Sequence, residues 1–254
     1  MKEDEKLPFT IHLEELRRRL ITSFIAVGIG FAGSYVFKEK LFDILTAPLI
    51  SVMKPGETLI YTNLPEAFFT FLKSALISGL MLASPVIIYQ FWMFIAPGLY
   101  QKEKRMLIPV VILSTLFFVG GSLFGYYVVF PFGFKFFLGF ASETIRPLPS
   151  MKEYLSFSSK LLLAFGLVFE LPLVITFLAK LGVVSVEFLK KNRKYALLLF
   201  FAGAAILTPP DVVTQIMMAL PMMLLYEISI IGARIFGKKK ADQETEPEED
   251  TVPD

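Results

Sequence analysis

One carboxylate lies deep inside a long apolar run of this sequence. Glu170 is about ten residues from either end of the hydrophobic segment 161–181, and Pro172 follows two positions later. An ionised carboxylate near the middle of a bilayer costs several kcal/mol, so such a residue faces a cavity, water or a polar partner. Glu170 therefore indicates a functional polar site within a membrane. The alternative is a protonated glutamic acid that hydrogen-bonds a neighbouring helix.

A second set of charged residues precedes the first apolar run. Leucines recur at helical spacing through the stretch HLEELRRRL at residues 12–20, which predicts an amphipathic helix on the inner membrane surface. The spacing also predicts i,i+4 ion pairs, Glu14 with Arg18 and Glu15 with Arg19. This helix either balances its own charge while its arginines fix the topology, or it presents a carboxylate to a ligand.

Two connecting segments carry further polar residues. The loop FIAPGLYQKEKR at residues 94–105 contains a Pro-Gly turn signal, and Glu103 lies there among three cations. Glu103 either balances the charge of a basic loop or presents a carboxylate on the inner face. In LTPPDVVTQ at residues 207–215, Asp211 is placed to cap the next helix. Gln215, one turn further, is polar within the membrane and has no such explanation.

Several classes of chemistry are excluded by residue types. The chain has no cysteine and a single histidine, His12, so the sequence predicts neither a thiolate nor a histidine metal cluster. It also contains no Walker loop and no paired catalytic residues on apposed apolar segments. We therefore expect neither an enzyme nor a cofactor, and any work must be driven by an ion gradient or a partner.

Six apolar segments must position these groups. Hydrophobic residues make up 55% of the 254 residues and charged residues 19%, against about 25% charged in soluble domains. Apolar runs of roughly 20 residues match the thickness of a bilayer, and continuous apolar runs span it as helices. We expect an all-α integral membrane protein whose six transmembrane helices lie at residues 20–37, 72–95, 106–130, 161–181, 195–207 and 212–233.

The charge distribution predicts the topology. With both termini inside, most of the 25 lysines and arginines fall in inner segments, as the positive-inside rule requires. We expect a membrane domain at residues 1–236 and a disordered, charged cytoplasmic tail at 237–254. The first residues lack the pattern of a cleavable signal or transit peptide, which favours a prokaryotic cytoplasmic membrane.

The last two spans are short, and prolines interrupt several others. The segment 195–207 would extend over roughly 20 Å, and the uninterrupted apolar part of the last, 216–226, over roughly 17 Å. Both fall short of the ~30 Å hydrocarbon core, so we expect a thinner bilayer beside them. Prolines within the apolar runs favour kinks and a concave bundle.

Several of these stretches together resemble the TatC family, the receptor core of twin-arginine translocases. The resemblance covers nearly the whole chain up to about residue 237. The matching pieces are HLEELRRRL at 12–20, TAPL at 46–49, SPVIIYQFWMFIAPGLYQKEKR at 84–105, VVFPFG at 128–133, YLSF at 154–157, AFGLVFELPL at 164–173 and TPPDVVTQ at 208–215.

The resemblance implies a cup-like helical bundle that binds the paired arginines of signal peptides on folded cargo at the cytoplasmic face. The residues that it assigns to signal-peptide binding are Glu15, Arg17, Leu20, Phe94, Leu99, Glu103 and Arg105. Other family positions of functional importance, within the membrane or at the outer face, correspond to Pro48, Glu170, Asp211 and Gln215.

The resemblance also implies partners and an energy source. They are single-span subunits of the TatA and TatB type, membrane lipid and further copies in a larger complex, with export driven by the proton-motive force and no role for nucleic acid. The physical chemistry agrees, because a guanidinium is a rigid fork that a carboxylate meets bidentately. The alternative is a proton-coupled secondary transporter or channel in which Glu170 is the ion site.

Overall fold

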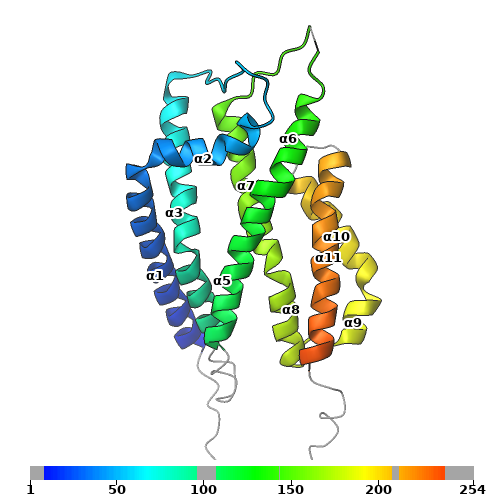
Figure 1. The fold of residues 1–254 in the computed structure, drawn as a ribbon. Coiled ribbons are helices and arrows are strands. Elements are labelled where there is room, and N and C mark those ends of the chain that lie inside the picture. Colours follow the sequence, from blue (N-terminus) through cyan, green and yellow to red (C-terminus); the bar gives the residue numbers. More distant parts are fainter. Residues whose placement is uncertain (1–8, 96–106, 143, 208–211, 238–254) are drawn as a thin grey trace, which may run out of the picture.

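The computed structural model describes residues 9–95, 107–142, 144–207 and 212–237 of the chain (Figure 1). The described residues form helices joined by loops, and an isolated bridge between Ile60 and Ser150 is the one strand-like pairing among them. The elements are α1 (Phe9–Val36), α2 (Lys38–Ile50), α3 (Leu64–Ile95), α5 (Leu107–Phe124), the π-helix η2 (Gly125–Val129), α6 (Phe130–Leu138), α7 (Met151–Phe169), α8 (Leu171–Lys180), α9 (Val186–Lys191), α10 (Arg193–Leu207) and α11 (Val212–Phe236).

Six helical stretches cross the membrane, as predicted. Within the described residues, five are long and apolar enough by themselves: Ile11–Val36, Leu64–Ile95, Ile108–Leu138, Met151–Lys180 and Val212–Phe236. The sixth is α10, whose 15 residues extend over roughly 22 Å. Several helices are longer than the apolar segments expected from the sequence, because they continue past the apolar run into polar residues at one end.

Two of the spans are divided where a proline removes a backbone donor. Before Pro131 the helix widens into η2, and the N–H of Phe130 donates to the carbonyl of Gly125, five residues back. Before Pro172 the helix breaks, so that α7 ends and α8 begins on either side of Glu170. The second break places the membrane carboxylate at a helix junction.

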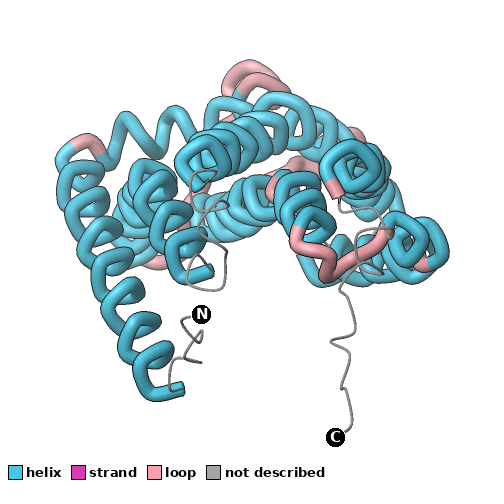
Figure 2. The backbone as a smooth tube through the Cα atoms, turned by 90° about the horizontal axis from the view of Figure 1, so that it is seen from below, coloured by secondary structure: helices cyan, strands magenta, loops and turns pink. Residues whose placement is uncertain are grey.

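The spans follow a curve with one open side, as Figure 2 shows. Along it α1 packs against α3, α3 against α5, α5 against α7, and α8 against α11. The backbones of α1 and α3 meet at two glycines, since a Cβ on Gly30 would lie 2.5 Å from the carbonyl oxygen of Gly79. The predicted concave bundle is confirmed. We call the end at which α1 begins the proximal end and the opposite one the distal end.

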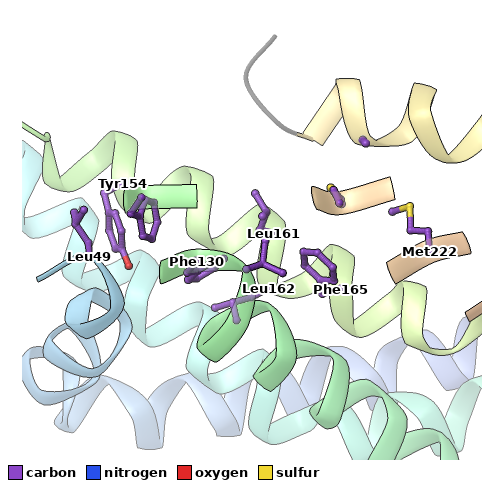
Figure 3. Close-up of a cluster of buried hydrophobic side chains, with 11 residues drawn as sticks. Leu49, Phe130, Tyr154, Leu161, Leu162, Phe165 and Met222 are labelled. Carbon is purple, nitrogen blue, oxygen red and sulfur yellow. The ribbon is translucent and has the colours of Figure 1, made fainter. Parts of the chain in front are cut away.

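The main hydrophobic cluster lies towards the distal end. Figure 3 shows side chains from α2, α6, α7 and α11 that meet there, including Leu49, Phe130, Tyr154, Leu161 and Met222. The short helix α2 lies across the bundle at this end (Figure 1). Burial of its apolar face therefore fixes α2 to the spans beneath it.

A proline in α2 provides an acceptor for one of those spans. Pro48 is buried inside α2 and has no N–H, so the carbonyl of Ile44, four residues back, lacks its helical donor. The hydroxyl of Tyr126, in η2, donates to this carbonyl at 2.5 Å. Tyr154 of α7 donates to the neighbouring carbonyl of Leu45 at 2.7 Å. Pro48, one of the family positions, thus exposes a backbone group that ties α2 to the bundle.

This arrangement predicts coupled effects on stability. Tyr126→Phe should lower the free energy of unfolding in detergent by about 1 kcal/mol, because the Ile44 carbonyl loses its donor. In a Pro48→Ala background the same change should cost less, because an alanine at position 48 supplies the missing helical N–H. Tyr127→Phe is the control, since the Tyr127 hydroxyl has no hydrogen bond to the described part of the chain. Equal effects of Tyr126→Phe in both backgrounds would contradict this account.

Candidate functional site

A polar pocket of about 700 Å³ lies at the proximal end, between α1 and α3. We call it the proximal pocket. Its lining residues are Ile11, Glu14, Glu15, Arg18, Arg19, Thr22 and Gln90. Glu15 is one of the residues that the resemblance assigns to signal-peptide binding, and six of the seven lining residues come from α1. The amphipathic helix predicted at residues 12–20 is continuous with the first span, as the beginning of α1.

The carboxylate of Glu15 already forms an ion pair within the protein. Arg19 donates from Nε to Oε1 of Glu15 at 3.0 Å, and its Nη2 donates to the same oxygen. The remaining Nη1 of Arg19 donates to Oε1 of Gln90 on α3 at 3.2 Å. The predicted Glu15–Arg19 pair is therefore formed and also joins two helices. The predicted pair of Glu14 with Arg18 is not formed; both side chains are exposed.

Phe94 lies at the same end of the bundle. Its ring stacks on that of His12, with ring centroids 4.3 Å apart and an angle of 21° between the planes. This contact brings the last turn of α3 against the beginning of α1. Arg17 and Leu20 are exposed on α1 and do not line the proximal pocket. Leu99, Glu103 and Arg105 lie outside the described residues.

Glu170 belongs to a hydrogen-bonded chain across three spans. The indole Nε1 of Trp92 on α3 donates to Oγ of Ser114 on α5 at 2.8 Å. The hydroxyl of Ser114 donates in turn to Oε2 of Glu170. Trp92 and Ser114 are 1% and 0% exposed, so neither group can exchange its partner for water without a rearrangement.

The two carboxylate oxygens of Glu170 have different surroundings. Oε2 accepts the hydrogen bond from Ser114, whereas Oε1 is buried and accepts none from the described residues. The sequence analysis gave a hydrogen bond to a neighbouring helix as the alternative explanation for Glu170. The bond from Ser114 is of this kind, but it satisfies only one of the two carboxylate oxygens. The sequence analysis missed Trp92 and Ser114. Trp92 is the only tryptophan of the chain, but a lone serine in an apolar run gave no signal.

Gln215 has a structural partner that the sequence did not indicate. Its Nε2 donates to the carbonyl of Phe201 at 3.0 Å and so joins α11 to α10. Nearer the proximal end, Arg193 pairs with Glu227 at 2.8 Å, both side chains being about half exposed. The helix α11 itself has 25 residues, but its apolar part between Gln215 and Glu227 remains short. Asp211 lies outside the described residues.

Glu170 and Gln215 lie at different depths. In Figure 1 both α8 and α11 run towards the proximal end, and Thr176 of α8 lies against Gly232 of α11. Glu170 precedes Thr176 by six residues, whereas Gln215 precedes Gly232 by seventeen. At about 1.5 Å per residue the two polar groups differ in depth by roughly 17 Å. A partner helix that met both would have to run along the bundle.

Comparisons with known proteins agree with one another. Residues 11–221 match the family model described as Sec-independent protein translocase protein (TatC). A TatC protein of Desulforapulum autotrophicum is 68% identical over 250 residues, which cover 98% of this chain and 93% of that protein. The TatC protein of Escherichia coli is 39% identical and covers 96% of this chain and 95% of its own length.

A solved structure has the same fold. The crystal structure of a twin-arginine translocase receptor, TatC, superposes with a TM-score of 0.80 at 45% sequence identity. The superposition covers 88% of this chain and 98% of the other. The arrangement of α1 to α11 is therefore that of this receptor.

Proposed function

This chain belongs to the TatC family of Sec-independent protein translocase proteins, and we propose that it binds twin-arginine signal peptides and forms the core of their export complex. The proximal pocket carries this proposal. It holds the carboxylate of Glu15 at the membrane end where the helix α1 begins, and that carboxylate already binds one guanidinium, that of Arg19. The same carboxylate can accept the guanidinium of a peptide when that peptide displaces Arg19.

A second acceptor is needed for the second arginine of the peptide. We assign this role to Glu103, in the segment that follows α3 in the sequence. The stacking of His12 on Phe94 supports the assignment, because it brings that end of α3 to the beginning of α1. Arg17, Leu20, Leu99 and Arg105 complete the proposed binding surface. Lysine cannot reproduce the planar, bidentate fork of arginine, so carboxylate acceptors would select Arg-Arg over Lys-Lys.

The proposed location is the bacterial cytoplasmic membrane, with both termini in the cytoplasm. The helix α1 begins at the same end of the bundle at which α11 ends (Figure 1), and most lysines and arginines fall in the segments assigned to that side. Residues 1–236 would form the membrane domain and 237–254 a cytoplasmic tail. In this orientation the proximal pocket faces the compartment in which the cargo is made.

The partners that we propose are single-span subunits of the TatA and TatB type. The buried oxygen Oε1 of Glu170 offers an acceptor to a polar residue of such a helix, because an unsatisfied carboxylate is costly within a bilayer. Gln215 and Asp211 would lie further along the same path, with Pro48 supporting the distal end. Export by this complex would draw on the proton-motive force, and further copies would join the assembly.

A peptide-binding experiment tests the proposal. The protein is purified in detergent and titrated with two signal peptides that differ only in Arg-Arg or Lys-Lys. We expect the Arg-Arg peptide to bind at least about tenfold more tightly, because one charge-assisted bond contributes about 1.5–3 kcal/mol. Equal affinities for the two peptides would count against a twin-arginine receptor. Proton or solute flux by the protein alone in liposomes would favour the transporter alternative.

A further inference from the structure

A second pocket lies at the distal end of the bundle, away from the proposed peptide site. It has a volume of about 750 Å³ and lies where α3 and α7 begin. We call it the distal pocket. Its lining includes two lysines, Lys73 and Lys152, together with the hydroxyl group of Ser156. Two cations and a hydroxyl in one pocket form a set of donors suited to an anion.

Lys73 has no carboxylate partner in the described part of the chain. Its ammonium group donates to Oγ of Ser156 at 2.8 Å and lies in no ion pair there. Lys152 and Lys160 are close enough to add to the positive potential at Lys73, and Glu153 is close enough to reduce it. One ammonium hydrogen is directed to Ser156, so the other two remain available to a ligand.

Glu66 is the one acidic residue in the pocket lining, and its carboxylate already accepts four hydrogen bonds. Its Oε2 accepts from N and Oγ1 of Thr62 at 2.8 and 3.0 Å. Its Oε1 accepts from Oγ of Ser150 at 2.7 Å and from the backbone N of Lys152 at 3.3 Å. Glu66 thus joins the segment before α3 to the start of α7. It forms no ion pair with Lys73 or Lys152, and its single negative charge leaves the two lysines of the pocket with a net positive charge.

The depth of the pocket matches that of lipid headgroups. The 32 residues of α3 extend over about 48 Å, well beyond the ~30 Å hydrocarbon core. Lys73 stands at the start of the apolar part of this helix, the level to which lysine side chains extend to reach headgroups. Leu76, one turn further into the apolar part of α3 than Lys73, is 47% exposed and would lie against an acyl chain.

We propose that the distal pocket binds the phosphate of an anionic phospholipid of that leaflet. The nonbridging oxygens of the phosphodiester accept hydrogen bonds from Lys73, Lys152 and Ser156, and the acyl chains extend from there along the apolar part of α3. The net positive potential of the lysines selects an anionic headgroup over a zwitterionic one. The bound lipid also contacts both α3 and α7, so it joins two spans at their distal ends.

Lipid binding to the purified full chain tests this inference. Native mass spectrometry in detergent counts bound dioleoylphosphatidylglycerol on the parent protein, on the double variant Lys73→Gln/Lys152→Gln and on Lys135→Gln. Lys135 is an exposed lysine of α6 outside the pocket, so its variant shows what the loss of a positive charge outside the pocket does. We expect one tightly bound lipid to be lost, with affinity at least about tenfold weaker, in the double variant alone. The parent should bind dioleoylphosphatidylcholine less tightly.

Two further measurements distinguish a lipid site from a free-phosphate site and a loss of binding from a loss of folding. Inorganic phosphate in millimolar excess should not displace the lipid, because it lacks acyl chains; displacement would identify a free-phosphate site and overturn the lipid assignment. Thermal unfolding with and without the lipid shows whether the double variant is folded, and only the parent and Lys135→Gln should be stabilised. Undiminished lipid binding by the folded double variant would overturn the proposal, as would equal loss in both variants.

Discussion

Replacing Glu15 by glutamine is expected to weaken the binding of an Arg-Arg signal peptide by about five- to tenfold. The amide keeps the size of the side chain and loses the charge, so a charge-assisted hydrogen bond of about 1.5–3 kcal/mol becomes an ordinary one. Isothermal titration or fluorescence anisotropy in detergent measures the affinity. The Lys-Lys peptide, which binds less tightly to the parent, should respond less to the substitution.

Arg19→Gln should change the same affinity in the opposite direction. Arg19 occupies the Glu15 carboxylate in the free protein, so a peptide must displace it, and the variant removes this competitor. Opposite effects of the two substitutions distinguish direct competition from damage to the fold. Glu103→Gln should weaken binding as Glu15→Gln does, without affecting membrane insertion. Unchanged affinity for the Arg-Arg peptide in Glu103→Gln would remove that residue from the site.

Replacement of Glu170, the carboxylate within the membrane, should affect the export of cargo and not the binding of the signal peptide. We expect Glu170→Ala to reduce export of folded cargo by about five- to thirtyfold, because a hydrogen bond between membrane helices contributes about 1–2 kcal/mol. Peptide binding in the proximal pocket should be retained, since that pocket does not include Glu170. Glu170→Gln should be milder, because the amide keeps an acceptor oxygen. Transport assays on membrane vesicles with all subunits present measure the effect.

Ser114→Ala is the matched control for Glu170. It breaks the chain from Trp92 to Glu170 and leaves the carboxylate in place. If the acidic group acts through its contact with a partner helix, Ser114→Ala should retain most of the export activity. Equal loss of export in Ser114→Ala and Glu170→Ala, with equal loss of thermal stability, would show that Glu170 serves the fold alone.

The helices were predictable because lipid leaves the backbone few choices. Each apolar run must satisfy its own hydrogen bonds, so the sequence predicts helices and most of their positions. The ends of the helices were harder to predict where a helix continues into polar residues. In α1, for example, the amphipathic segment and the first span form one helix. The break at Glu170 was also foreseeable in part, since Pro172 cannot donate to the helix.

The sequence by itself determined the fold class, the polar residues and, through seven matching stretches, the family. Hydropathy, proline positions and motif order are one-dimensional properties and need no packing. Which groups meet was decided only by the tertiary structure. Arg19 bonds to Gln90, 71 residues away, and Ser114 reaches Glu170 over 56. Side chains on different helices meet only where the spans pack, because no sequence periodicity fixes how one helix is rotated and shifted against another.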